Sequence, residues 1–215
     1  DEDEDTAFDW YRKSAGQGVG KAQYKVGVFY LKGSSVDKDL EVAATPAQHF
    51  SGRGIFDRNK TLWASWVIKT PFHTIFFSGD SGYFDGFKQI GEKYGPFDMT
   101  FIECGAYGEG WPKVHMFPEQ TVQAHLDLKG NVLHPIHWGT FNLAFHGWTE
   151  PAERLRVAGA DVRIVIWQVG QSVGPDQPPS LARWWPADVP WQTAQDSPVV
   201  ASGTSAGHQR ASDGG

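Results

Sequence analysis

TIFFSGDSGYFDGFKQIGEKYGPFDMTFIEC (74–104) contains a complete strand–helix–strand pattern. The apolar run TIFFSGD (74–80) predicts a strand, DGFKQIGEKYG (85–95) predicts a helix closed by its final glycine, and DMTFIEC (98–104) predicts the next strand. Because strands and helices that alternate along a chain build a sheet covered by helices, this stretch predicts a mixed α/β domain.

The same alternation continues on both sides of this stretch. Upstream, LWASWVIK (62–69) predicts a strand that joins the run at 74–80 through a hairpin-like turn. Downstream, the pattern predicts helices at 118–130 and 150–160 and strands at 131–138 and 161–170. The sequence therefore predicts one α/β unit over residues 44–191.

Three side chains stand where a predicted strand gives way to a loop. They are His49, Asp80 and His137, separated by 80 − 49 = 31 and 137 − 80 = 57 residues. Imidazole and carboxylate are ligands that zinc takes in catalytic sites, so the set predicts a metal site assembled from several strand ends. Each residue also has a simpler explanation, since Asp80 precedes a Ser-Gly turn and histidines are common in loops.

Four longer segments give these side chains a context. They are TPAQHFSGRGIFDRNKTLWASWVI (45–68), FFSGDSGYFDGFKQIGEKYGPFD (76–98), GAYGEGWPKVHMFPEQTVQAHLDL (105–128) and HPIHWGTFNLAFHGWTEPAERL (134–155). In this order, between Val42 and Trp167, they resemble the second half of the metallo-β-lactamase fold. Within that fold they resemble the branch of the phospholipase D that hydrolyses N-acylphosphatidylethanolamine and of bacterial ascorbate-lactonase-like proteins. The resemblance implies the second half of an αββα sandwich.

The resemblance also implies a centre of two zinc ions. His49 would bind the first ion, Asp80 would bridge both ions, and His137 would bind the second. Asp80 and His115 are the candidate catalytic residues, although a surface histidine that precedes a helix would give the same pattern as His115. The implied activity is hydrolysis of a phosphodiester or lactone, in a small-molecule or lipid-like substrate, through a metal-bound hydroxide.

Members of this superfamily also carry an H-x-H-x-D-H motif, which this sequence lacks. Residues 1–44 contain no histidine, so the chain supplies three of the family's seven metal-binding side chains. Catalytic zinc normally has three protein ligands, and two for each ion predict weak binding and impaired activity. We expect either an impaired hydrolase, in a truncated or fused gene product, or a non-enzymatic interaction module built on a degenerate sandwich.

Residues 1–43 predict a separate unit. They resemble a single Sel-like repeat, a relative of the tetratricopeptide helix pair, through the segments WYRKSAGQG (10–18), AQYKVGVFY (22–30) and GSSVDKDLE (33–41). The second helix of this hairpin is expected at about 21–31. Such repeats bury their faces on neighbours, so a single copy predicts a protein partner or docking on the rest of the chain. Residues 192–215 are rich in small and polar residues and predict a disordered tail.

The composition excludes other classes of function. A formal charge of −6 and a pI near 5.7 give no reason to expect nucleic acid as a partner. No apolar run reaches the roughly 18 residues of a membrane span, and the acidic start DEDED differs from a signal peptide, so we expect a cytoplasmic protein. Cys104 is the one cysteine, which excludes an internal disulfide. The 10 tryptophans predict either core packing or an aromatic wall that binds lipid.

Overall fold

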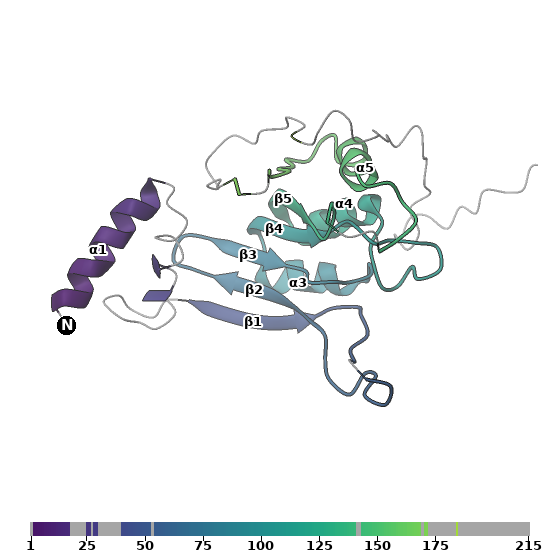
Figure 1. Cartoon of the computed structure of the whole chain (residues 1–215), viewed down its shortest axis with the longest axis horizontal. Helices are drawn as coiled ribbons and strands as arrows, with labels where there is room; N and C mark the ends of the chain where they lie inside the picture. The colour runs from purple at the N-terminus through teal and green to yellow at the C-terminus, as the bar shows by residue number, and fades with distance from the viewer. Residues whose placement is uncertain are drawn as a thin grey trace, which may run out of the picture.

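The computed structural model of the chain describes residues 2–17, 25–26, 28–29, 40–52, 54–140, 143–168, 170–171 and 184. Its centre is one five-stranded sheet in the order β1-β2-β3-β4-β5 (Figure 1). The strands are β1 (Glu41–Pro46), β2 (Ala64–Lys69), β3 (Thr74–Phe77), β4 (Phe97–Glu103) and β5 (Gly130–Ile136). The helices are α1 (Glu2–Gly16), α3 (Gly86–Tyr94), α4 (Pro118–Asp127) and α5 (Glu150–Ala158). The α/β class predicted from the sequence is confirmed.

Two kinds of strand pairing divide the sheet. β1, β2 and β3 pair antiparallel, whereas β3, β4 and β5 pair parallel. The β2–β3 connection is the expected hairpin turn, in which the Thr70 hydroxyl accepts hydrogen bonds from the N–H groups of Phe72 (3.2 Å) and His73 (2.9 Å). Parallel pairs need crossover connections, which α3 and α4 supply. Because β1 runs in the same direction as β3, the carboxyl ends of β1, β3, β4 and β5 all lie at one edge of the sheet.

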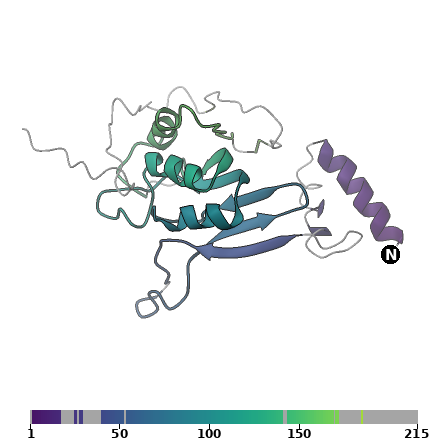
Figure 2. The same ribbon diagram turned by 180° about the vertical axis from the view of Figure 1, so that it is seen from behind.

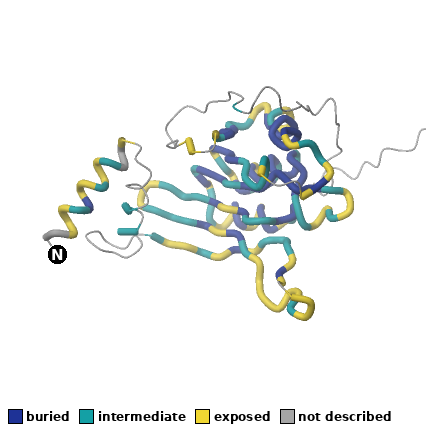
Figure 3. Tube along the Cα trace, viewed as in Figure 1, coloured by how far each residue is buried: buried dark blue, intermediate teal, exposed yellow. Residues whose placement is uncertain are grey.

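One face of the sheet is covered by α3 and α4, and α5 packs on α4 (Figure 2). Phe76 of β3 is fully buried on this face, and its ring centroid lies 6.1 Å from that of Phe87 in α3. Gly91 lets α3 approach the end of α4 closely, since a Cβ atom there would meet the carbonyl group of Asp127. The buried apolar layer continues through β4, β5 and α5 (Figure 3), with Ile102, Leu133 and Leu155 fully buried. This layer fixes the positions of the strand ends.

β1 is a strand that the sequence does not predict. EVAATP spans the boundary between the units predicted at 1–43 and 44–191, and its strand character depends on its pairing with β2. The hydroxyl groups of Thr45 and Ser65 lie 2.7 Å apart across this pair, buried from solvent. A neighbour distant in sequence therefore decides the conformation of this segment.

The prediction of a strand at 161–170 is wrong, apart from one bridge between this segment and β5. In the described part of this segment, a parallel bridge between Leu133 and Ile164 is what remains of it. The N–H of Leu133 donates to Arg163 and its carbonyl group accepts from Val165, both at 2.9 Å. The next residue on this side of β5 is Pro135, which has no N–H and cannot continue the ladder.

The first helix expected of the N-terminal unit is present as α1. Phe8 is buried, and its ring centroid lies 5.4 Å from that of Phe29, in a second helical segment. Most of residues 21–31 and all of 192–215 lie outside the described residues. The Sel-like repeat, the domain boundaries and the disordered tail therefore stay predictions. Among the described residues, no helix has the length and apolar character to cross a membrane, and the cytoplasmic location stays a prediction.

Candidate functional site

Four side chains predicted from the sequence meet at the edge of the sheet where β1, β3, β4 and β5 end. His49 follows β1, Asp80 follows β3, His137 follows β5, and His115 lies in the loop between β4 and α4. The Nε2 atom of His137 lies 3.4 Å from Oδ1 of Asp80. The ring centroid of His115 lies 5.0 Å from that of His137 and 5.4 Å from that of His49. The structure thus gathers all four residues into one cluster.

Backbone geometry directs these side chains to the same place. Gln48, which precedes His49, donates its backbone N–H to Ser81 Oγ (3.0 Å), and its carbonyl group accepts from the N–H of Gly82 (2.9 Å). These two bonds tie the His49 loop to the loop that carries Asp80. His137 has a φ of +62°, a conformation that is uncommon for residues other than glycine and that clusters at functional sites.

The three histidines share one orientation of their ring nitrogens. Nδ1 of His49 lies 2.7 Å from the carbonyl oxygen of Phe50, which can only accept, so this nitrogen carries the proton. Nδ1 of His115 lies 2.7 Å from Oε2 of Glu103, and Nδ1 of His137 lies 3.8 Å from the same oxygen. Histidines that bind metals commonly hydrogen-bond their second nitrogen to a carbonyl or carboxylate, as His49 and His115 do here, whereas the 3.8 Å contact of His137 is too long for a hydrogen bond. The arrangement leaves Nε2 as the candidate ligand atom of each ring.

Glu103 is the component of the site that sequence reasoning missed. It ends β4, is fully buried, and accepts a hydrogen bond at Oε1 from the N–H of Met116 (2.6 Å). Burial raises the pKa of Glu103 well above its usual range, while the Met116 N–H and His137 act in the opposite direction. The one signal in the sequence is an acid at the end of an apolar strand, FIE, which on its own reads as the point where the strand reaches solvent.

The electrostatic environment favours neutral imidazoles. Burial lowers the pKa of His115 below 6.5, against the opposing effect of the Asp80 charge. Burial also lowers the pKa of His49, and the Phe50 carbonyl group partly offsets this effect. A histidine whose pKa is lowered loses its proton at a lower pH than usual. Both rings are therefore neutral at pH 7 and offer a lone pair.

The donor set fits a divalent cation of the zinc type. Two ligand atoms on one tetrahedral zinc ion, each about 2.0–2.2 Å from the metal, lie about 3.4 Å apart. The measured separation between His137 Nε2 and Asp80 Oδ1 is 3.4 Å. Imidazole nitrogen and carboxylate oxygen are also the donor types that zinc accepts. In the described part of the chain, ligand atoms of Glu103, His115 and His137 also lie within 4.8 Å of one another.

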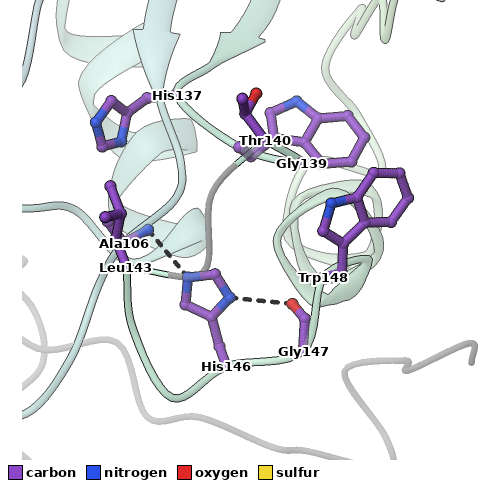
Figure 4. A pocket seen from close by; sticks show the side chains of 9 residues that line it. Ala106, His137, Gly139, Thr140, Leu143, His146, Gly147 and Trp148 are labelled. Atoms are coloured by element: carbon purple, nitrogen blue, oxygen red, sulfur yellow. Dashed lines mark hydrogen bonds between the residues drawn. The ribbon is translucent and has the colours of Figure 1, made fainter.

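A cavity of about 670 Å³ opens beside His137 (Figure 4). Its walls are mainly apolar and come from residues 137–140, 143 and 146–148 and from Ala106. Trp138, Leu143 and Trp148 supply the large side chains of the lining. The volume is in the range of small-molecule sites, which is about 300–1,000 Å³. An apolar group bound in this cavity would lie next to the histidine cluster.

His146 forms part of the cavity wall and has both ring nitrogens occupied. Its Nε2 atom accepts the N–H of Ala106 (2.9 Å), so Nδ1 carries the proton that bonds the Gly147 carbonyl group (3.0 Å; Figure 4). Its ring stacks on Tyr107 with centroids 4.2 Å apart. His146 therefore supports the wall of the cavity. His134 packs between Phe101 and Trp167, at centroid distances of 4.8 and 4.6 Å, away from Asp80.

Tryptophans pack on the core and also border the site, and a lipid-binding role for them stays a prediction. Trp138 and Trp148 line the cavity with ring centroids 6.2 Å apart, and Trp138 also packs on the main hydrophobic core. Trp63 lies against His49 with ring centroids 4.7 Å apart and is 39% exposed. Aromatic side chains therefore border the site on two sides.

Comparison with known proteins identifies the family. The profile described as "Beta-lactamase superfamily domain" matches residues 26–138, which is more than half of the chain. The chain belongs to this superfamily, and its sheet and helices are those of a metallo-β-lactamase fold domain. The fold resemblance stated from the sequence is confirmed.

Individual relatives agree with this assignment. An uncharacterized protein of Mycobacterium tuberculosis is 48% identical over 152 residues, covering 68% of this chain and 41% of the relative. The N-acyl-phosphatidylethanolamine-hydrolyzing phospholipase D 1 of Caenorhabditis elegans is 36% identical over 123 residues, covering 55% of this chain and 35% of the relative. The chain thus spans less than half the length of these relatives.

A solved structure supports the same fold. The isothiocyanate hydrolase from Delia radicum gut bacteria superposes with a TM-score of 0.50 at 16% identity, covering 63% of this chain and 54% of that chain. At this identity the likeness concerns the fold alone.

Proposed function

We propose that the chain is a zinc-dependent hydrolase of the metallo-β-lactamase superfamily that acts on a phosphodiester or a lactone. The observation that carries the proposal is the 3.4 Å separation of His137 Nε2 and Asp80 Oδ1, with His49 and His115 beside them. The cluster lies at the carboxyl ends of parallel strands, where α/β proteins bind their ligands. His49 and Asp80 would hold one metal ion, and Asp80 and His137 would hold a second.

The residues of the chain have distinct roles in this proposal. Zinc at this position would polarise a phosphoryl or carbonyl oxygen and favour the ionisation of water. Asp80 would offset the positive charge, and its carboxylate would help to hold the metal. His115 is neutral at pH 7 because burial lowers its pKa, and its Nε2 lone pair can accept the proton that the attacking water loses.

The cavity beside His137 defines the expected substrate. Its walls are apolar and contain Trp138, Leu143 and Trp148, which suit an aromatic or acyl group. The polar part of such a molecule would then lie next to His137 and Asp80. The relation to a phospholipase D and the apolar cavity together favour a small-molecule or lipid-like phosphodiester.

The activity of the chain by itself is expected to be impaired. The 215 residues contain no H-x-H-x-D-H motif, so His49, Asp80 and His137 are three of the seven metal-binding side chains of the family. Two protein ligands for each ion are fewer than the three that catalytic zinc normally has. We therefore expect weak zinc binding and slow turnover.

Zinc binding and turnover by the purified chain test the proposal. Zinc affinity is measured by competition with a chromogenic chelator, and turnover with bis(4-nitrophenyl) phosphate and with a γ-lactone. Asp80→Ala should weaken zinc binding at least about 100-fold, since even partners outside the ligand shell contribute about 10–100-fold. It should also remove the zinc-dependent turnover.

Asp85→Ala is the matched control, because Asp85 is an exposed carboxylate in the same loop and its side chain makes no capping hydrogen bond to α3. This variant should keep both properties. Zinc binding that is equally strong in Asp80→Ala, or turnover that survives this change, contradicts the proposal.

One observation favours a second candidate function, a non-enzymatic interaction module. Trp10 on α1 is 68% exposed, whereas Phe8 on the same helix is buried against the second helical segment. An exposed tryptophan of this kind is a typical contact residue for a protein partner. Loss of partner capture in Trp10→Ser, with unchanged zinc binding, would support this function.

A further inference from the structure

Glu103 is a buried acid with every polar group engaged. Its backbone N–H donates to Ser78 Oγ (3.0 Å), and its backbone carbonyl group accepts from Thr121 Oγ1 (2.6 Å). Oε1 of the side chain accepts the N–H of Met116 (2.6 Å). Oε2 faces two imidazoles, at 2.7 Å from Nδ1 of His115 and 3.8 Å from Nδ1 of His137. The segment after β3 and helix α4 therefore fix the backbone of Glu103, and the loop between β4 and α4, which carries His115 and Met116, holds its carboxylate.

The position of Oε2 distinguishes two possible roles. If Glu103 were a metal ligand, Oε2 would bind the same cation as both histidines. If Glu103 were a positioning residue, Oε2 would accept hydrogen bonds from the protonated nitrogens of the two rings. The 2.7 Å contact with His115 is the length of a charge-assisted hydrogen bond. Both contacts reach Nδ1, while Nε2 of His137 lies 3.4 Å from Asp80 on the other side of the ring. Glu103 and Asp80 thus lie against different nitrogens of the His137 ring.

His137 gives a second, independent observation. Its Nδ1 atom is buried and has no hydrogen-bond partner among the described residues. Oε2 of Glu103 lies 3.8 Å from this atom, and a movement of about 1 Å would bring the pair to ordinary hydrogen-bond distance. The rings of His115 and His137 are nearly parallel, at 18°, so one carboxylate oxygen can serve the two Nδ1 atoms together.

We propose that Glu103 is a positioning residue that fixes the tautomer of both histidines. Its carboxylate holds the proton of His115 on Nδ1 and attracts that of His137 to Nδ1, which leaves both Nε2 atoms as lone-pair donors. Nε2 of His137 would bind the metal, and Nε2 of His115 would accept a proton during hydrolysis. The roles of these two nitrogens rest on the proposed function, but the tautomers themselves do not, and they can be measured without any substrate.

The test is a long-range ¹H–¹⁵N correlation spectrum of the metal-free, ¹⁵N-labelled chain at about pH 8, above the usual imidazole pKa of about 6.5. The expected result is that His115 carries its proton on Nδ1 and has an unprotonated Nε2. A Glu103 side chain that stays protonated would donate to Nδ1, and His115 would then carry its proton on Nε2. That spectrum would overturn the proposal whatever the enzymatic activity is.

Glu103→Gln should invert the tautomer of His115. The amide oxygen of glutamine would keep the hydrogen bond from Met116, so its NH₂ group would face Nδ1 of His115 and donate to it. The proton of His115 would then move to Nε2. Glu150→Gln is the matched control, since Glu150 is also buried and accepts hydrogen bonds from Tyr107 and Arg154. It should leave the His115 spectrum unchanged.

Zinc titration completes the experiment. Glu103→Gln should lower zinc affinity about 10–100-fold, as expected for a partner outside the ligand shell, and Glu150→Gln should not. Loss of the Nδ1 proton of His115 when zinc is added would show that zinc binds on the Glu103 side and would overturn the positioning role. If Glu103→Gln does not fold, the spectrum of the unaltered chain still decides between the tautomers.

Discussion

Replacement of Arg154 by methionine should destabilise the fold much more than the same replacement at Arg156, two residues later on α5. Arg154 is fully buried. Its guanidinium group donates two hydrogen bonds to Glu119 of α4, at 3.1 and 2.7 Å, and one to Glu150 at 2.9 Å. It thereby joins α5 to α4, which in turn packs on the sheet.

The magnitude follows from the charges that the variant leaves behind. Glu150 is buried, and without Arg154 its remaining side-chain partners are neutral donors, among them the hydroxyl of Tyr107 at 2.6 Å. Breaking a buried ion pair by removing one partner costs about 3–5 kcal/mol, because an uncompensated charge stays buried. Arg156 is 34% exposed and lies 3.5 Å from Glu153, whose side chain is 6% exposed, so solvent partly screens this longer ion pair and its loss should cost less than that of the Arg154 network.

Urea unfolding followed by tryptophan fluorescence measures both variants under the same conditions. The expected free energies of unfolding differ by at least about 2 kcal/mol, with Arg154→Met the less stable variant. Methionine keeps an apolar stem of similar length, so lost packing adds little to the difference. Equal unfolding midpoints for the two variants would show that the buried network does not join α5 to α4 as described.

Three further predictions concern the core and the cavity. Burial lowers the pKa of His125 to about 4, so the unfolded state binds a proton from pH 6.5 downward while the folded state resists it. His125 should therefore contribute on the order of 3 kcal/mol to the fall in the free energy of unfolding between these two pH values, and His125→Gln should remove this part in urea titrations while the part from His134, whose pKa burial also lowers to about 4, remains. Gly91→Ala should cost about 1–3 kcal/mol because the added methyl group meets the carbonyl group of Asp127, whereas Gly110→Ala, with no described atom within 4 Å, should cost far less in the same assay. Trp148→Ala should lower kcat/KM for an aromatic phosphodiester about tenfold or more and leave a small aliphatic one unchanged; equal losses for both would exclude the cavity as the binding site of the aromatic group.

Much of the fold could be predicted because the signals are local. The strand, helix and strand at 74–104 correspond to β3, α3 and β4, since apolar periodicity within each segment already matches the face that it buries. β1 has no such signal, because four of its six residues are exposed and pairing with β2 makes it a strand. The strand expected at 161–170 fails for a reason outside that segment, namely the missing N–H of Pro135 in β5.

The site shows the same distinction. Asp80 and His137 could be expected to meet because parallel strands bring their carboxyl ends to one edge of the sheet. Glu103 ends β4, the strand between β3 and β5. Its part in the site depends on the contact with His115, which a loop brings next to it, and no local sequence pattern predicts that contact. Arg154 is similar, since its sequence context, EPAERLRVAGA (150–160), gives no indication that one arginine is buried and the other is partly exposed.

Anomalous X-ray scattering at the zinc edge, from crystals of the chain grown with zinc, tests the central claim most directly. A peak within about 2.0–2.2 Å of both Nε2 of His137 and a carboxylate oxygen of Asp80 is the expected result. The same crystals of Asp80→Ala should lack this peak. Zinc bound elsewhere in the chain, with none between His137 and Asp80, would contradict the assignment of this strand edge as a metal centre.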